Sequence, residues 1–151
     1  MVHNYSKRSR RNLSLGIAKM NKISTKERLY CLIGLIFPMM LGLFIYLTSG
    51  KSTYISNVAQ LPTINYPVFI INYLCDFLWA FALCCGLRLI GNPLKKCFII
   101  STTSSIVIEV SQKFLSFGTF DVIDILVEVA AIVLVIISIR MITKRGTYLY
   151  E

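Results

Sequence analysis

Five carboxyl side chains lie within, or at the rim of, segments that are otherwise apolar enough to cross a membrane: Asp76, Glu109, Asp121, Asp124 and Glu128. A charge near the centre of a bilayer costs roughly 2.5–3.5 kcal/mol on insertion scales. A chain that bears this cost repeatedly is expected to build a polar site inside the membrane. The chemistry open to such a site is that of carboxyl groups: holding protons, binding a cation, or accepting hydrogen bonds from a ligand.

Helical spacing sorts the polar residues into stripes. Asn72, Asp76 and Trp79 follow an i, i+4, i+7 pattern and would share one face of a helix. Glu109 and Gln112 follow an i, i+3 pattern, which gives a second face on a later helix. Because lipid excludes polar groups, such faces are expected to turn toward other polar faces of the protein.

A third stripe combines Asp121, Asp124 and Glu128 at i, i+3, i+7. The short connection 115–119, with Gly118 as its turn residue, makes the helices on either side antiparallel neighbours. The second and third stripes then lie on either side of the connection that joins these two helices. We predict that the ligand-binding or proton-handling residues are Asp76, Glu109, Gln112 and Asp124, with supporting roles for Asn72, Trp79, Asp121 and Glu128.

Simpler roles are open for three of these residues. Asp121 could be the N-cap or first-turn acid of the helix that follows it, worth up to about 1 kcal/mol. Gln112 could serve only as an interhelical hydrogen-bonding residue, and Trp79 could be a packing aromatic. The acids that remain need counter-charges, and protons, metal ions or a cationic ligand are all open at this point.

Four apolar blocks must position these side chains: residues 29–48, 68–90, 97–114 and 120–139. The first has about twenty residues without a charge, which is the length that a spanning helix needs. The third has a polar centre of serine and threonine over 101–105, but hydroxyls can bond within or between helices and do not exclude a span. We therefore expect an all-α membrane protein with four transmembrane helices.

The basic residues give this chain an orientation. With four spans and both termini in the cytoplasm, fourteen of the sixteen Lys and Arg residues lie on the cytoplasmic side, and only Lys51 and Lys113 face out. Such an excess is what the positive-inside rule requires. We therefore predict a multi-pass protein of the cell (plasma) membrane, N-in and C-in. In this orientation the five acids all fall in the outer half of the bilayer.

Three segments make up the predicted organisation: a basic cytoplasmic segment over 1–28, a four-helix membrane domain over 29–139 and a cytoplasmic tail over 140–151. The basic segment is either a short interfacial helix on the anionic inner leaflet or a disordered tail that only fixes topology. The first apolar block is too long for the core of a cleaved signal peptide and is expected to remain as an anchor.

Cysteine and histidine point to no chemistry. The five cysteines are odd in number and include no C-x-x-C pair, which argues against a disulfide framework or a zinc site. We expect them to be buried thiols that act as small hydrophobic groups. His3, the only histidine, is a poor metal ligand by itself. No metal or cofactor is predicted, and membrane topology accounts for the net charge of +9 better than nucleic-acid binding does.

Three segments of the chain resemble the VanZ-like family of small bacterial membrane proteins: YLCDFLWA over 73–80 followed by Leu83, EVSQ over 109–112, and GTFDVID over 118–124. That family pairs a D-x-x-W-like segment with E-x-x-Q and G-x-F-D-x-x-D, and the similarity covers roughly 29–139. The chain departs from the family at Glu128, where Asn is frequent, and at Ala130 and Ala131, where glycines occur.

The resemblance implies a protein of the bacterial envelope. The family's namesake is associated with low-level resistance to the glycopeptide teicoplanin, and the family's biochemical activity is not settled. The acidic site would then bind an envelope-related ligand, such as a lipid headgroup, a glycopeptide or an envelope precursor. The alternative is a small proton- or cation-coupled transporter. An intramembrane hydrolase ranks last, because the chain offers no Ser/His or Cys/His arrangement for nucleophilic catalysis.

Overall fold

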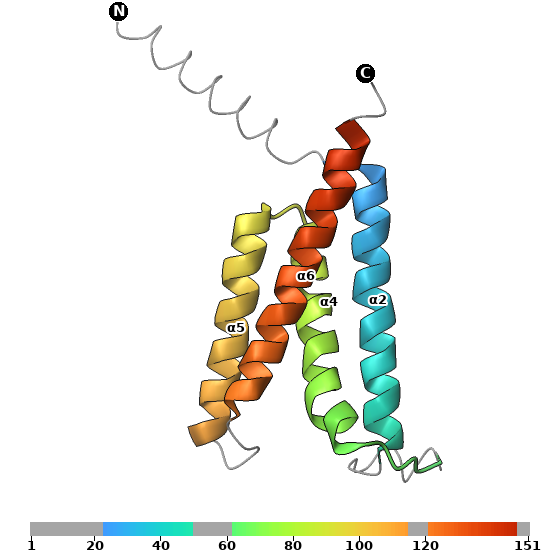
Figure 1. Cartoon of the computed structure of the whole chain (residues 1–151), viewed down its shortest axis with the longest axis vertical. Helices are drawn as coiled ribbons and strands as arrows, with labels where there is room; N and C mark the ends of the chain where they lie inside the picture. The colour runs from blue at the N-terminus through green and yellow to red at the C-terminus, as the bar shows by residue number, and fades with distance from the viewer. Residues whose placement is uncertain (1–22, 50–61, 115–120, 148–151) are drawn as a thin grey trace, which may run out of the picture.

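The computed structural model is a bundle of helices that alternate in direction (Figure 1). It describes residues 23–49, 62–114 and 121–147, so residues 1–22 of the predicted basic segment and the connection that contains Gly118 lie outside the described residues. The described part contains helices and no strand, which confirms the all-α class for these residues. In chain order the elements are α2 (Thr25–Thr48), the π-helical turn η1 (Ile70–Leu74), α4 (Cys75–Leu89), α5 (Leu94–Phe114) and α6 (Val122–Thr147).

Helix α2 begins before the first uncharged block. Ser24 is its N-cap, and the Ser24 side chain accepts a hydrogen bond from the backbone N–H of Glu27 at 3.2 Å. A serine followed three residues later by glutamate is a common helix-start signal. The helix continues through Pro38 and, at 1.5 Å per residue, is about 36 Å long. The predicted start at residue 29 was late because it counted only the uncharged residues.

The second predicted span contains a π-helical turn at its start. Both Ile70 and Ile71 donate their backbone N–H to the carbonyl of Pro67, at 2.9 and 3.4 Å, and η1 then leads directly into α4. A π turn takes more residues than an α turn and changes which side chains share a face. The spacing between Asn72 and Asp76 is therefore not that of a regular α-helix.

Three helical segments are long and apolar enough to cross a membrane: Thr25–Thr48, Ile70–Leu89 and Val122–Thr143. Helix α5 has 21 residues but does not belong to this group of three. Three such helices are consistent with an integral membrane protein. The fourth span and the orientation of the chain in a membrane stay predictions.

The helices pack in a fixed order. Helix α2 lies against α4, α4 lies against α6, and α5 contacts both α6 and α4. Small side chains allow the close approach of α2 and α4: a Cβ atom placed on Gly34 would meet Cys85 Sγ at 2.7 Å and the Phe81 ring at 3.0 Å. Small residues at helix contacts are typical of membrane proteins, because they let backbones come close together.

The core is small and partly sulfur-rich. Its fully buried members are Cys31, Ala80, Cys84, Cys85, Cys97, Ala131, Ile132, Val135 and Ile139. All five cysteines are free thiols and only Cys75 is partly exposed, which fits their predicted role as small hydrophobic groups. Large apolar side chains instead cover the outside of α2, where Phe37 and Met40 are more than half exposed. Apolar exposure on this scale suits lipid rather than water.

The bundle has two ends, which we name by a residue at each. At the Arg88 end, α2 begins, α6 finishes, and the turn at Gly91 (φ +91°) joins α4 to α5. At the Asp76 end, α2 and α5 finish while α4 and α6 begin (Figure 1). The alternation of helix direction therefore brings the first turns of α4 and α6 to the last turns of α5.

Candidate functional site

The predicted site residues lie at the Asp76 end, on three different helices. Asp76 is in the first turn of α4, Glu109 and Gln112 are near the end of α5, and Asp124 and Glu128 are in the first two turns of α6. Sequence order separates these residues by up to about fifty positions, and helix alternation brings them back together. We call Asp76, Glu109, Asp124 and Glu128 the acidic cluster.

Glu109 is one of the most enclosed groups in the cluster. Only 2% of its surface is exposed. Gln112 Nε2 donates a hydrogen bond to Glu109 Oε1 at 3.2 Å, one turn away on the same helix. The second carboxyl oxygen, Oε2, is buried and has no hydrogen-bond partner in the described part of the chain. Gln112 thus orients one oxygen of Glu109 and leaves the other available.

Helix α6 supplies two acids on one face. Glu128 is 2% exposed and lies beside the side chain of Ser105 from α5. Asp124, one turn earlier, is partly buried and within electrostatic range of Glu109. Among the residues that the structure describes, neither Asp124 Oδ1 nor Glu128 Oε2 has a hydrogen-bond partner, although both atoms are buried. The cluster therefore presents three buried acceptor oxygens that no described protein group satisfies.

Asp76 connects the cluster to the outside of the bundle. Its carboxyl lies within electrostatic range of Asp124, Glu128 and Glu109. The same side chain, together with Trp79, lines an open cavity of about 350 Å³ between α2 and α4. Asp76 therefore faces the buried acids and also lies at an opening on the α2–α4 side.

The supporting residues differ in their placement. Asp121 caps α6: its Oδ1 accepts a hydrogen bond from the backbone N–H of Ile123 at 2.9 Å, as expected for an N-cap. Its Oδ2 accepts a longer bond of 3.5 Å from the Tyr73 hydroxyl, which ties η1 to the start of α6. Trp79 packs against the core as well as lining the cavity. Asn72 lies in the π turn and is exposed, so it does not share the cavity that Asp76 lines.

The chemistry of the cluster follows from burial and like charge. Four carboxyl groups in a poorly hydrated site cannot all be charged without a counter-charge. Within residues 23–49, 62–114 and 121–147, no group of three or more His, Cys, Asp or Glu side chains is arranged to hold a metal ion. The arrangement instead suits protons or the hydrogen-bond donors of an organic ligand, for which carboxyl oxygens are strong acceptors.

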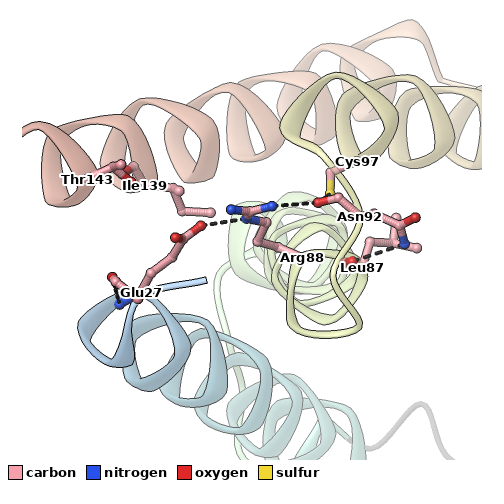
Figure 2. Close-up of polar contacts among 8 residues, drawn as sticks. Glu27, Leu87, Arg88, Asn92, Cys97, Ile139 and Thr143 are labelled. Atoms are coloured by element: carbon pink, nitrogen blue, oxygen red, sulfur yellow. Dashed lines mark hydrogen bonds and ion pairs between the residues drawn. The ribbon is translucent and has the colours of Figure 1, made fainter. Parts of the chain in front are cut away.

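Sequence reasoning missed a second charged site at the Arg88 end. Arg88 Nε donates to Glu27 Oε1 at 2.5 Å, and the exposed fractions of the two side chains are only 12% and 2%. Arg88 also donates from Nη1 to the carbonyl of Asn92 at 2.8 Å. Figure 2 shows the Glu27 side chain of α2 pointing to the guanidinium of Arg88 on α4, close to the turn that leads into α5.

Two signals in the sequence could have identified this pair. Glu27 is the only acid among the eight cations that precede or begin the first apolar block, and it stands three residues after the helix-capping Ser24. Arg88 is the only cation in α4. A single acid on one helix and a single cation on another, at ends of the two helices that meet, predict an ion pair, because a buried charge needs a partner. Counting Arg88 only as a topology signal concealed this role.

The chain matches no protein-family model, no curated protein and no solved structure.

Proposed function

We propose that the protein is a VanZ-like integral membrane protein of the bacterial envelope whose acidic cluster binds the amine-bearing headgroup of a lipid. The observation that carries this proposal is the set of three buried and unpartnered carboxyl oxygens, on Glu109, Asp124 and Glu128. A buried acceptor without a partner costs about 1–3 kcal/mol. A ligand that donates several hydrogen bonds would recover that free energy, and a positive charge would also offset the repulsion among the acids.

The opening at Asp76 favours a lipid over a water-soluble glycopeptide. The cavity that Asp76 and Trp79 line also contacts Pro38 and Leu78. These last two residues also border a second cavity of about 340 Å³, which lies between α2 and α4 and is lined by Phe37, Phe77 and other apolar groups. An acyl chain fits an apolar groove of this kind, and Asp76 stands where the groove meets the acids. An amine headgroup is the complement to that charge.

The test compares two lipids that differ in the amine. Phosphatidylethanolamine carries a primary amine and phosphatidylglycerol does not. We expect added phosphatidylethanolamine to raise the melting temperature of the detergent-solubilised protein more than phosphatidylglycerol does. The difference should disappear in Asp76→Asn and in the pair Glu109→Gln with Asp124→Asn.

The control variant is Asp121→Asn, because asparagine is also a good N-cap and this position belongs to the end of α6 rather than to the unpartnered set. It should keep the preference for phosphatidylethanolamine. Equal responses to the two lipids in the wild-type protein would rule out the headgroup assignment. An undiminished preference in both site variants would place the lipid elsewhere on the protein.

A role in glycopeptide resistance rests on the resemblance and can be examined separately. If the site acts in resistance to teicoplanin, Glu109→Gln and Asp124→Asn should remove protection in cells without lowering the amount of protein. Unchanged susceptibility in both variants would end that proposal while leaving lipid binding to the test above.

A second candidate function, a small proton- or cation-coupled transporter, is favoured by one further observation. Polar groups do not stop at the acidic cluster: buried hydroxyls of Ser105 and Ser101 continue along α5 toward the Arg88 end. A transporter should change a pH gradient across a vesicle membrane when its substrate is added, and Asp76→Asn should abolish the change. No response to any envelope-related substrate would reject this candidate.

A further inference from the structure

The buried face of α5 is a single polar row. Four residues of this helix are buried, and they recur at intervals of four: Cys97, Ser101, Ser105 and Glu109. Residues four apart lie above one another on the same face of a helix. We call these four residues the polar seam. With a rise of 1.5 Å per residue, the seam extends about 18 Å along α5.

The hydroxyls of the seam are not satisfied in the way that others in this chain are. Ser111 donates to the carbonyl of Val107 at 2.6 Å, and Thr48 donates to the carbonyl of Phe44 at 2.7 Å, in each case four residues earlier. By contrast, Ser101 Oγ and Ser105 Oγ, and beside them Thr102 Oγ1, are buried without a hydrogen-bond partner in the part of the chain that the structure describes. Such groups are ordinarily satisfied by bound water when the protein does not satisfy them.

Polar side chains of two neighbouring helices lie beside the seam. Glu128 of α6 lies near the Ser105 hydroxyl and Cys84 of α4 lies near the Ser101 hydroxyl, but neither pair has the geometry of a hydrogen bond. Ala131 and Ile132 of α6 are buried in the same core cluster as Cys84 and Cys97. Small and apolar neighbours of this kind would confine water to a file along the polar groups rather than let it spread through the bundle.

Each end of the seam meets a charged site. At the Asp76 end it begins with Glu109 in the acidic cluster, where Asp76, Asp124 and Glu128 are the other members and Asp121 is a further acid within electrostatic range of Asp124. At the Arg88 end, Cys97 Sγ donates to the carbonyl of Asn92 at 3.5 Å, and the same carbonyl accepts from Arg88. Arg88 in turn pairs with Glu27, as Figure 2 shows. A chain of polar groups thus runs from one end of the bundle to the other.

We infer that the polar seam is a hydrated pathway that conducts protons between the acidic cluster and the Glu27–Arg88 pair. A serine hydroxyl can accept one proton and donate another, so hydroxyls alternating with water pass a proton without becoming charged for long. Carboxyls at the two ends release and take up the proton. At the Arg88 end the last transfer to the Glu27 carboxylate runs through water, because the Asn92 carbonyl only accepts hydrogen bonds and a guanidinium does not deprotonate in proteins. This inference rests on the second candidate function and needs no identified substrate.

The test measures proton flux in the absence of any ligand. The purified protein is reconstituted in vesicles of phosphatidylglycerol and phosphatidylethanolamine that contain a pH-sensitive dye, and a potassium gradient with valinomycin supplies the driving potential. We expect wild-type vesicles to change internal pH faster than protein-free vesicles. Ser101→Ala and Ser105→Ala should each slow the flux by roughly tenfold, the factor that a barrier higher by about 1.4 kcal/mol produces.

Two matched variants separate the pathway from general effects of mutation. Thr103→Ala removes a hydroxyl from the exposed side of the same helix and should leave the flux unchanged. Ser105→Thr keeps the hydroxyl and should retain most of the flux. Gel filtration and melting temperature show whether each variant is folded, and Ser101→Ala and Ser105→Ala provide two independent tests of the same pathway.

The outcomes distinguish this inference from the proposed lipid site. Wild-type flux equal to that of protein-free vesicles would overturn the pathway, as would full flux in a folded Ser101→Ala or Ser105→Ala variant. Neither result would bear on the lipid-binding proposal, which is tested by the shift in melting temperature. Conversely, seam-dependent flux in a protein that shows no preference between the two lipids would support the pathway and reject the headgroup site.

Discussion

The buried ion pair between Glu27 and Arg88 offers the sharpest test of the structure. Replacing Arg88 by Met leaves the Glu27 carboxyl, which is 2% exposed, without its partner. Removing one member of a buried pair costs about 3–5 kcal/mol, because the remaining charge stays desolvated and uncompensated. The Arg88 variant also loses the 2.8 Å hydrogen bond to the carbonyl of Asn92. We therefore expect a loss of about 3–5 kcal/mol of unfolding free energy in Arg88→Met.

A variant in which both Glu27 and Arg88 are replaced distinguishes a buried ion pair from an exposed one. When Glu27 and Arg88 are both replaced by Met, no buried charge remains, and stability should return to within about 1 kcal/mol of the wild type. The coupling between the two substitutions should then be at least about 2 kcal/mol. An exposed pair would give single losses of only about 0.2–1 kcal/mol and little coupling.

The assay is reversible unfolding in mixed detergent micelles with increasing sodium dodecyl sulfate, followed by helical circular dichroism. Lys96→Met, which removes an exposed cation near the same turn, is the control and should cost less than about 0.5 kcal/mol. The reasoning is refuted if each single variant costs less than about 1 kcal/mol, or if the double variant costs as much as the two single losses together.

Three further predictions concern packing, capping and topology. Gly34→Ala should destabilise the protein by about 1–3 kcal/mol, because the new Cβ would meet the Cys85 thiol of α4 at 2.7 Å. Gly42→Ala should be tolerated, because the nearest neighbour of its Cβ would be 3.9 Å away. Equal melting temperatures of the two variants would contradict the close approach of α2 and α4. Asp121→Ala should cost about 1 kcal/mol through loss of the cap, and Asp121→Asn should cost much less; thermal unfolding of the pair decides this. In a cysteine-accessibility scan of whole cells, a cysteine at Phe117 should react with an impermeant reagent and one at Asn92 should not; the reverse pattern would invert the orientation.

The acids could be located from sequence because two regular features determine their positions. Helix period fixes which side chains share a face, and short connections force neighbouring helices to alternate in direction. Together these features bring Asp76 to the level of Glu109 and Asp124 without any knowledge of packing. The capping role of Asp121 was also accessible, because an acid directly before an apolar helix is a local signal that depends on few other residues.

Other features depended on contacts that no local pattern encodes. The π turn over Ile70–Leu74 changes the register between Asn72 and Asp76. The Glu27–Arg88 pair joins residues 61 positions apart. Both residues had ordinary explanations in the sequence, one as part of a helix start and the other as a topology charge. Only the packing of α2 on α4 shows that each is buried against the other.

Helix α5 shows why the average hydropathy of a helix can be too low for a membrane span although the helix could lie in a membrane. Its average composition is too polar for the group of apolar spans, yet the polar residues Ser101, Ser105 and Glu109 are buried. Apart from Thr103 and the lysines near its ends, its exposed side chains are large and apolar: Phe98, Ile99, Ile100, Ile106, Val107, Ile108, Val110 and Phe114. Lipid contacts only the side of a helix that faces away from the bundle. A polar stripe that faces other helices therefore does not carry the full free-energy cost of insertion into the membrane.

The length and ends of α5 agree with this interpretation. Twenty-one residues give a helix of about 30 Å, close to the thickness of the hydrocarbon core. Lys95 and Lys96 stand at one end and Lys113 at the other, where long basic side chains can reach the interfaces. A helix with an apolar outside and a polar inside would be unstable in water and is suited to lipid. We therefore expect α5 to be the fourth span, and the polarity that lowers its average hydropathy to be the same polarity that forms the acidic cluster and the polar seam.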